Sequence, residues 1–256
     1  MLAPQRHAII LEHLRGSGSA SLATLVDLTG ASESTIRRDL LALSSHSGNV
    51  RRIHGGAVSA RPESSIYEPP SQVAEHLNTQ AKQRIGDAAA KLMLDGQSVI
   101  FDSSSTVMAA ARAAIKRGLS ITAITNDLAI AQVLNTSAAG SVIVSGGILR
   151  SNTNTMYGPV CESLLRGIHV DLLFLGAHAV SETGLSESSM EIADIKRHMI
   201  STAKRVVLLA DQSKFGRRSF AHICGLRDLD MMITDATAAQ CAEYGLQETG
   251  VQLRLV

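Results

Sequence analysis

The apolar positions of the first sixty residues recur at helical spacing and fall into three groups. They predict three helices, over about residues 3–15, 22–29 and 32–43. Gly16 and Gly30 end the first two, and Ser32 can cap the third. A polar connector, residues 17–21, separates the first helix from the second. Two helices joined by a short turn that contains glycine are the signature of a helix-turn-helix.

A hairpin is expected directly after the third helix. Residues 49–53 and 57–59 can pair as two strands around the segment His54-Gly55-Gly56. This hairpin would be the wing of a winged helix-turn-helix domain, which we assign to residues 1–60. Residues 61–78 are polar and hold three of the five prolines of the chain, which indicates a linker.

From residue 79 to the end, short apolar runs alternate with segments of helical spacing. The runs predict strands near residues 98–102, 121–126, 142–147, 170–177, 206–211, 231–235 and 251–256. Helices are expected near residues 85–93, 107–116, 128–134, 159–166 and 192–204. This alternation is typical of an α/β domain whose mostly parallel sheet is covered on both faces. We assign residues 79–256 to this second domain.

The composition narrows the class of protein. Hydrophobic residues make up 45% of the chain but aromatic ones only 3%, so the core must consist mainly of aliphatic side chains. No apolar run reaches transmembrane length and the first residues do not resemble a signal peptide, so we expect a cytoplasmic protein without a membrane partner. Cys161, Cys224 and Cys241 are far apart and form no metal-binding spacing. We therefore expect neither a metal nor a cofactor.

Positive charge gathers on the third helix and the hairpin, although the net charge of the chain is only +1. Residues 34–61 contain five arginines and one acid, a local net charge of +4. A recognition helix places its N-terminal residues at base edges in the major groove of DNA. The residues expected to contact DNA are Ser34, Thr35, Arg37 and Arg38 on the helix, and Arg51, Arg52 and His54 on the hairpin. The competing interpretation is an ordinary surface helix with solvated arginines.

Small polar residues follow nearly every predicted strand of the second domain. In open parallel sheets, ligands bind beyond the carboxyl ends of the strands. A helix N-terminus with hydroxyls, amides and a lysine near it suits a phosphate group. The candidate effector-binding residues are Asp102, Ser103, Ser104, Ser105, Thr106, Thr125, Asn126, Gly146, Gly147 and Lys214. Taken singly, each also fits a helix cap, a tight turn or a surface lysine.

Two segments of the first domain resemble the N-terminal signature of the DeoR family of bacterial transcriptional regulators. They are TIRRDL, residues 35–40, and HGGA, residues 54–57. The resemblance covers essentially the whole chain, and the segments similar to the family's sensor motifs are 102–106, 125–126, 145–147, 171–176 and 211–214. In one departure, Ser104 stands where the family's loop usually has glycine.

The resemblance implies a function. The family joins a DNA-binding winged helix to a sensor domain for a phosphorylated sugar or a related metabolite. Its members usually repress sugar-catabolic operons and act as oligomers. We therefore expect a repressor that binds double-stranded operator DNA, responds to a phosphorylated sugar and forms a dimer or a tetramer.

The second domain also resembles ribose-5-phosphate isomerase. VVLLADQSK, residues 206–214, is similar to that enzyme's strand ending in Ala-Asp-x-Ser-Lys. The enzyme's acidic loop corresponds to residues 175–179, which carry no carboxylate. This pattern indicates a sensor without enzymatic activity. Glu187 and Glu191 are nearby acids that could replace the missing ones, so an isomerase with an accessory DNA-binding domain stays open as an alternative. A third possibility is a constitutive DNA-binding protein whose larger domain serves only for association.

Overall fold

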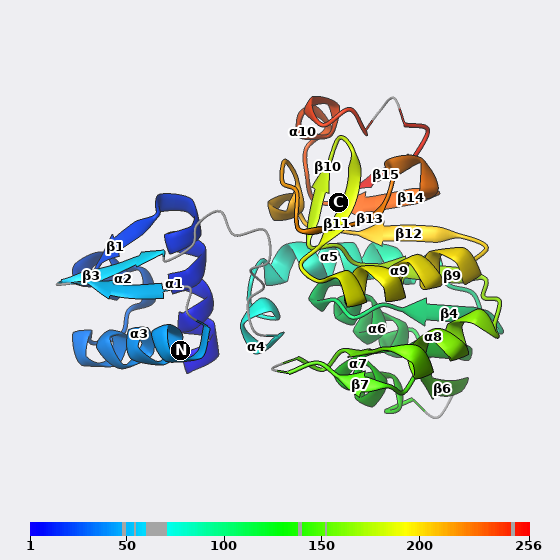
Figure 1. Cartoon of the computed structure of the whole chain (residues 1–256), viewed down its shortest axis with the longest axis horizontal. Coiled ribbons are helices and arrows are strands. Elements are labelled where there is room, and N and C mark those ends of the chain that lie inside the picture. The colour runs from blue at the N-terminus through cyan, green and yellow to red at the C-terminus, as the bar shows by residue number, and fades with distance from the viewer. Residues whose placement is uncertain (48–49, 54, 60–70, 138–139, 152, 247–248) are drawn as a thin grey trace. The chain divides into compact units, whose positions relative to one another are not determined.

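The computed structural model divides the chain into two compact units, residues 1–77 and 78–256 (Figure 1). It describes residues 1–47, 50–53, 55–59, 71–137, 140–151, 153–246 and 249–256. His54 and most of the expected linker, residues 60–70, lie outside the described residues. Among the described residues, every helix is too short or too polar to cross a bilayer.

The N-terminal unit combines helices with a small antiparallel sheet. Its helices are α1 (Ala3–Ser17), α2 (Leu22–Thr29), α3 (Glu33–Ser47) and the short α4 (Ser71–Ala74). Its strands are β1 (Ser19–Ser21), β2 (Val50–Ile53) and β3 (Gly56–Ser59), in the spatial order β1-β3-β2. The three helices and the hairpin predicted from the sequence are therefore present. Within residues 61–78, where we expect a linker, α4 places Val73 in the core of this unit.

In the N-terminal unit, two helix ends differ from the prediction, each for a local reason. The first helix continues through Gly16 and ends at Gly18, whose left-handed φ of 73° closes the last turn with a hydrogen bond to Leu14 O. The third helix runs four residues beyond Leu43, to Ser47. There the hydroxyls of Ser44 and Ser45 donate to the carbonyl of Leu41 in the same helix. The two serines therefore do not draw the backbone into a turn that would end the helix.

The connector between α1 and α2 is a strand, which its polar composition concealed. Residues 19–21 of β1 pair with residues 56–58 of β3, and only Ala20 is buried. A Cβ at Gly56 would overlap the carbonyl oxygen of Ala20, so glycine lets β1 approach. Gly55, at the hairpin tip, has a φ of 85°. The two glycines thus have different roles, one for the turn and one for the third strand.

The C-terminal unit is built on a seven-stranded parallel sheet. Its strands are β4 (Ser98–Phe101), β5 (Ile121–Thr125), β6 (Gly140–Val144), β9 (Leu172–Leu175), β12 (Val206–Leu209), β14 (Met231–Thr234) and β15 (Gln252–Leu255). Their spatial order is β15-β14-β12-β9-β4-β5-β6. The predicted class, a mostly parallel α/β domain, is confirmed.

Helices cover both faces of this sheet, and side chains alternate between two hydrophobic clusters. The helices are α5 (Thr79–Ala90), α6 (Ser105–Lys116), α7 (Leu128–Leu134), α8 (Pro159–Arg166), α9 (Met190–Thr202) and α10 (Ala238–Glu243). Val99 and Phe101 pack with α5, α6 and α7, whereas Ile100, between them in β4, packs with α8 and α9. This alternation is the two-residue period of a strand that is buried on both sides.

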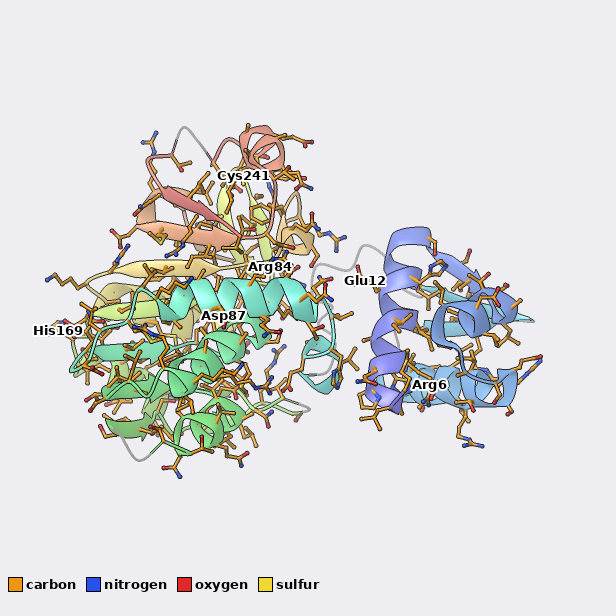
Figure 2. The ribbon with its side chains drawn as sticks, turned by 180° about the vertical axis from the view of Figure 1, so that it is seen from behind. Arg6, Glu12, Arg84, Asp87, His169 and Cys241 are labelled. Atoms are coloured by element: carbon orange, nitrogen blue, oxygen red, sulfur yellow. The ribbon has the colours of Figure 1, made fainter. Side chains whose placement is uncertain are left out.

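Short strands that were not predicted from the sequence lie outside the seven-stranded sheet. They are β7 (Ile148–Leu149), β8 (Met156–Tyr157), β10 (Ala179–Ser181), β11 (Gly184–Glu187) and β13 (Ala221–Cys224). They are two to four residues long, and none is a run of four apolar residues like those of β9 and β12. The three cysteines are buried free thiols, including Cys241 on α10 (Figure 2).

Candidate DNA-binding surface and effector site

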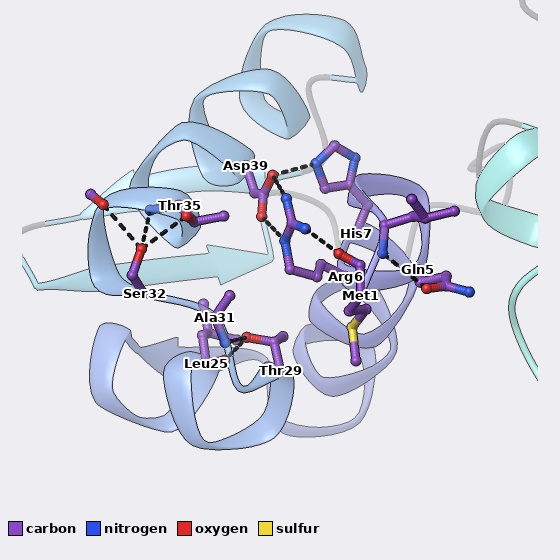
Figure 3. Close-up of polar contacts among 12 residues, drawn as sticks. Met1, Gln5, Arg6, His7, Leu25, Thr29, Ala31, Ser32, Thr35 and Asp39 are labelled. Carbon is purple, nitrogen blue, oxygen red and sulfur yellow. Dashed lines mark hydrogen bonds and ion pairs between the residues drawn. The ribbon is translucent and has the colours of Figure 1, made fainter.

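The recognition helix α3 begins at a serine cap and exposes its cationic face. The hydroxyl of Ser32 accepts a hydrogen bond from Thr35 N at 3.3 Å and lies 2.9 Å from the Thr35 hydroxyl (Figure 3). This bond satisfies one of the free N–H groups of the first turn. Ser34, Arg37 and Arg38 are exposed, and Thr35 is half-buried. The four helix residues predicted from the sequence therefore all remain accessible to some degree.

The two arginines of α3 differ in their surroundings. Arg37 Nη2 lies 2.5 Å from Glu33 Oε1, one helical turn away, and more than half of each side chain is exposed. Exposed ion pairs of this kind contribute little to stability, about 0.3–0.5 kcal/mol, so Arg37 can exchange Glu33 for another anion. Arg38 forms no ion pair with any residue in the described part of the chain.

Asp39, the acid of the RRD sequence, faces the interior of the domain. Arg6 of α1 donates two parallel hydrogen bonds to its carboxylate, from Nε at 2.7 Å and from Nη2 at 3.0 Å (Figure 3). His7 Nε2 lies 3.1 Å from Asp39 Oδ1. Asp39 is only 5% exposed, and its charge is compensated inside the domain. The exposed face of α3 is therefore more cationic than the sequence count suggested.

The Arg6–Asp39 contact should fix the recognition helix against α1. We expect Asp39→Asn to lower the free energy of unfolding by about 1–3 kcal/mol, because it leaves the partly buried guanidinium donors of Arg6 without a full acceptor. Glu33→Gln is the matched control, since it removes a carboxylate from the same helix and from another arginine pair, but at the surface. Its effect should stay within about 0.5 kcal/mol. Thermal and urea unfolding of both variants measures the difference, and equal losses would contradict the anchoring role.

The wing presents its two arginines on different faces. Arg51 and Arg52 are consecutive in β2 and both are exposed, so their side chains project to opposite sides of the hairpin. Val50, which precedes them, is buried in the domain core. The third residue predicted for the wing, His54, lies outside the described residues.

In the C-terminal unit, the direction of strand order reverses between β4 and β9. The chain adds β5 and β6 on one side of β4, and then β9, β12, β14 and β15 on the other. Ligands of open parallel sheets bind in the crevice outside such a reversal. Asp102 follows β4 and Gly176 follows β9 at this point, and Gly176 N donates to Asp102 Oδ2 at 2.8 Å.

A buried lysine that the sequence pattern did not single out contacts both residues at this reversal. Lys196 of α9 donates to Asp102 Oδ2 at 2.6 Å and to Gly176 O at 2.9 Å. Its Nζ also lies 3.3 Å from Glu187 Oε2, and all three charged side chains are almost completely buried. Burial lowers the pKa of Lys196, but the charges of Asp102 and Glu187 outweigh burial and raise the pKa above its ordinary value. Among the described residues, Asp102 Oδ1 has no hydrogen-bond partner.

The loop after β4 is held in place from three sides. Ser104 caps α6, and its hydroxyl accepts from Thr106 N at 3.2 Å. Ser103 N donates to Asn126 Oδ1 at 3.2 Å. Gly176 lies so close to Ser104 that a Cβ on the glycine would overlap the serine side chain. Ser105, the first residue of α6, is half-buried, whereas Thr106 is buried.

Thr125 and Asn126 are buried and already engaged within the protein. Thr125 Oγ1 donates to Phe101 O at 2.7 Å, and Asn126 Nδ2 donates to Met156 O at 3.1 Å. These contacts hold the Ser103 loop and β8 in position. Any role of the two residues in ligand binding thus acts mainly through the backbone they fix.

The glycine pair after β6 forms a turn at the end of the sheet. Gly146 and Gly147 have φ values of 70° and 111°, which favour glycine. A Cβ at Gly147 would overlap the carbonyl oxygen of Tyr157 in β8. Strand β5 lies between β6 and β4, so this turn is one strand removed from the crevice.

Lys214 follows β12, which lies next to β9 in the sheet, and a second lysine, Lys82, lies near the same carboxylate, Asp211. Burial raises the pKa of Asp211, but Lys214, a hydrogen bond from Ser213 and Lys82 together bring that pKa below its ordinary value. Lys82 of α5 is only 6% exposed. Asn78 Nδ2 donates to Asp211 Oδ1 at 3.0 Å, while Asp211 Oδ2 has no partner among the described residues.

The missed residues share one signal in the sequence. Lys196 occurs at the spacing of Ile192, Ile195 and Met199, which are all buried on α9. Lys82 precedes Ile85 by three residues on α5, and Asp39 follows Ile36 by three on α3. A charge on the apolar side of a helix indicates a buried partner, because an unpaired charge is rarely buried.

Comparison with known proteins identifies both units. Residues 6–63 match the DeoR-like helix-turn-helix domain, and residues 77–236 match the DeoR C terminal sensor domain. The HTH-type transcriptional regulator GlpR of Haloferax volcanii is 38% identical over 98% of this chain and 97% of its own length. The putative aga operon transcriptional repressor of Escherichia coli O157:H7 is 33% identical over 98% of this chain and 93% of its own.

Solved structures give a more partial likeness. Ribose 5-phosphate isomerase A from Methanocaldococcus jannaschii aligns with a TM-score of 0.40 and 19% identity, covering 54% of this chain and 55% of that one. A likeness at this level says nothing about activity. The family models and the full-length relatives agree on the assignment that the residues suggested. The chain belongs to the DeoR family of transcriptional regulators.

Proposed function

We propose that this regulator is a cytoplasmic repressor of a sugar-catabolic operon. Residues 1–60 bind operator DNA, residues 61–78 link the domains, and residues 79–256 bind the effector and mediate self-association. The observation that carries the proposal is the capped recognition helix, which exposes Ser34, Arg37 and Arg38 while Asp39 faces inward. Two relatives, named the putative aga operon transcriptional repressor and the HTH-type transcriptional repressor GlcR, support repression rather than activation. A third relative is named an L-fucose operon activator.

The DNA contacts divide into base and backbone contacts. Ser34 and Thr35 lie at the start of the helix, where side chains reach base edges. One of Arg37 and Arg38 donates to guanine O6 and N7, and the other holds a phosphate. Arg51, Arg52 and His54 contact the backbone or the minor groove.

The effector is a phosphorylated sugar that binds at the carboxyl ends of the strands. The first turn of α6 presents amide groups and hydroxyls to its phosphate, and Lys214 adds a positive charge from the end of β12. Two buried carboxylate oxygens, Asp102 Oδ1 and Asp211 Oδ2, lack partners in the described residues and can accept sugar hydroxyls. The predicted set, Asp102 to Thr106, Thr125, Asn126, Gly146, Gly147 and Lys214, encloses or supports this site. No cofactor is needed.

The proposal excludes enzymatic turnover. Glu187, the better placed of the two acids that could act as a base, already faces Lys196 at 3.3 Å and accepts from Ser188 N. Glu191 is exposed and accepts from Ser189 Oγ at 2.5 Å, which with its own backbone amide lowers its pKa below the ordinary value. Turnover of ribose 5-phosphate that Glu187→Gln abolishes would support the alternative of an isomerase.

The effector response should separate from DNA binding. Ser105→Ala and Lys214→Ala should leave operator affinity unchanged but weaken the sugar-phosphate effect at least about tenfold, because each removes one donor to the phosphate. Gel-shift titrations at fixed salt, with and without a panel of sugar phosphates, measure both quantities. The DNA would come from upstream of the gene itself and of the neighbouring operon. Lys91→Ala, at an exposed position, is the matched control. A normal response in both site variants would remove the proposed site, and binding that no compound alters would favour a constitutive DNA-binding protein.

A further inference from the structure

Strand β6 forms one edge of the seven-stranded sheet. It pairs with β5 over residues 140–144, and in the sheet order no described strand lies on its other side. Every residue of β6 is exposed or half-buried, in contrast to the fully buried strand β9. The outer N–H and C=O groups of such a strand are a ready template for another strand.

This edge lacks the features that usually prevent association. Residues 140–149 contain no charged residue and no proline. Proteins commonly block an edge strand with lysine, proline or a bulge. The opposite edge strand, β15, has Arg254 in its middle. The two edges of the sheet thus differ, because, of the two edge strands, only β6 lacks a charged residue that would hinder pairing with another strand.

Exposed aliphatic side chains extend the edge into a patch. The edge patch consists of Ile143, Val144, Ile148, Leu149 and Val160, which are 37%, 41%, 54%, 51% and 61% exposed. They are near one another, since a Cβ at Gly146 would lie 3.4 Å from Val160 and one at Gly158 would lie 3.5 Å from Ile148. Figure 1 shows β6 and β7 at the same end of the C-terminal unit. The patch includes side chains on both faces of β6 and thus surrounds the open edge, and exposed aliphatic clusters of this kind commonly mark an interface.

We infer that a second copy of this chain covers the edge patch, with β6 antiparallel to the β6 of its partner across a two-fold axis. A two-fold axis brings the same patch of each copy together, so the patch must be complementary to itself. The uncharged segment 140–149 meets this condition because its pairing opposes no like charges. Helix-turn-helix regulators bind two half-sites as symmetric pairs, which this axis provides. The inference rests on the proposed self-association and names its surface.

Sedimentation velocity of the full-length protein over a concentration series tests the surface. The wild type should sediment as a dimer or a larger assembly of the 27.1 kDa chain. Ile143→Lys should shift the population toward the monomer and weaken association at least about tenfold, because it would place a lysine from each copy in the apolar interface. Leu94→Lys is the matched control, since Leu94 is 62% exposed but lies outside the edge patch, and it should leave the mass unchanged.

Val144→Lys provides a second variant on the other face of β6, and circular dichroism checks that each variant is folded. A dimeric wild type with two folded lysine variants that remain dimeric would overturn the edge patch while self-association stands. A wild type that is monomeric at every concentration would overturn the edge patch together with the proposed self-association. Loss of the dimer in Leu94→Lys as well would also contradict the assignment to β6.

Discussion

Replacing Lys196 with methionine should destabilise the C-terminal unit by about 3–5 kcal/mol, the loss found when one partner of a buried ion pair is removed. Methionine has nearly the same length as lysine, so packing changes little. The carboxylates of Asp102 and Glu187 would then face each other in the interior without a cation. Three structural elements, β4, β9 and β11, would lose their common contact with α9.

Tyrosine fluorescence during urea unfolding can follow this loss. The chain has no tryptophan, and of its three tyrosines Tyr157 and Tyr244 lie in the C-terminal unit, while Tyr67 lies outside the described residues. The pKa of Lys196 is raised in the folded protein, so its contribution to wild-type stability should be complete at both pH 6 and pH 9, below its unfolded pKa. Lys91→Met, at an exposed position, should change stability by less than about 0.5 kcal/mol. Equal losses in the two variants would show that the buried ion pairs do not stabilise the fold.

Removing both arginines of the recognition helix should weaken specific DNA binding by about 100-fold or more. A bidentate arginine–guanine contact contributes about 1–3 kcal/mol to discrimination, and a phosphate contact adds a term that depends on salt. Arg37→Ala and Arg38→Ala should therefore differ in kind. In the variant that loses the phosphate contact, the slope of log affinity against log salt concentration should fall by about one. The other variant should lose its preference for one base pair.

Gel-shift titrations of the single and double variants at several salt concentrations distinguish these effects. Arg227→Ala is the matched control, because it removes an exposed arginine from the C-terminal unit. Glu33→Gln adds a second test, since it frees Arg37 from its surface pair and should leave affinity unchanged or increase it. Unchanged affinity in the double variant would contradict the assignment of α3 as the recognition helix.

The architecture could be predicted from the sequence because the apolar pattern of each helix and strand lies within one continuous segment of the chain. Apolar spacing predicted α1, α2 and α3, and short apolar runs predicted the seven strands of the parallel sheet. The strand β1 was missed because Ser19 and Ser21 are polar and a single buried residue, Ala20, carries no period. Helix ends shifted because cap geometry, such as the left-handed turn at Gly18, depends on the folded backbone.

The candidate sites were predictable in part. Residues that follow strands or begin helices could be placed from local pattern, which is how Ser34 and Arg38 were put at the start of α3 and Ser104 at the start of α6. The ion pairs of Arg6 with Asp39 and of Lys196 with Asp102 join residues 33 and 94 positions apart. Only the fold brings these partners together, and periodicity alone indicates no more than that one of them is buried.

The contact between Ser104 and Gly176 ties together two positions that are distant in the chain. A methyl group on residue 176 would collide with the side chain at residue 104, so alanine is tolerated at 176 only when residue 104 has no Cβ. The two positions should therefore change together during divergence, with a side chain at one accompanied by glycine at the other. A library that randomises both residues together would recover combinations that successive single substitutions cannot reach.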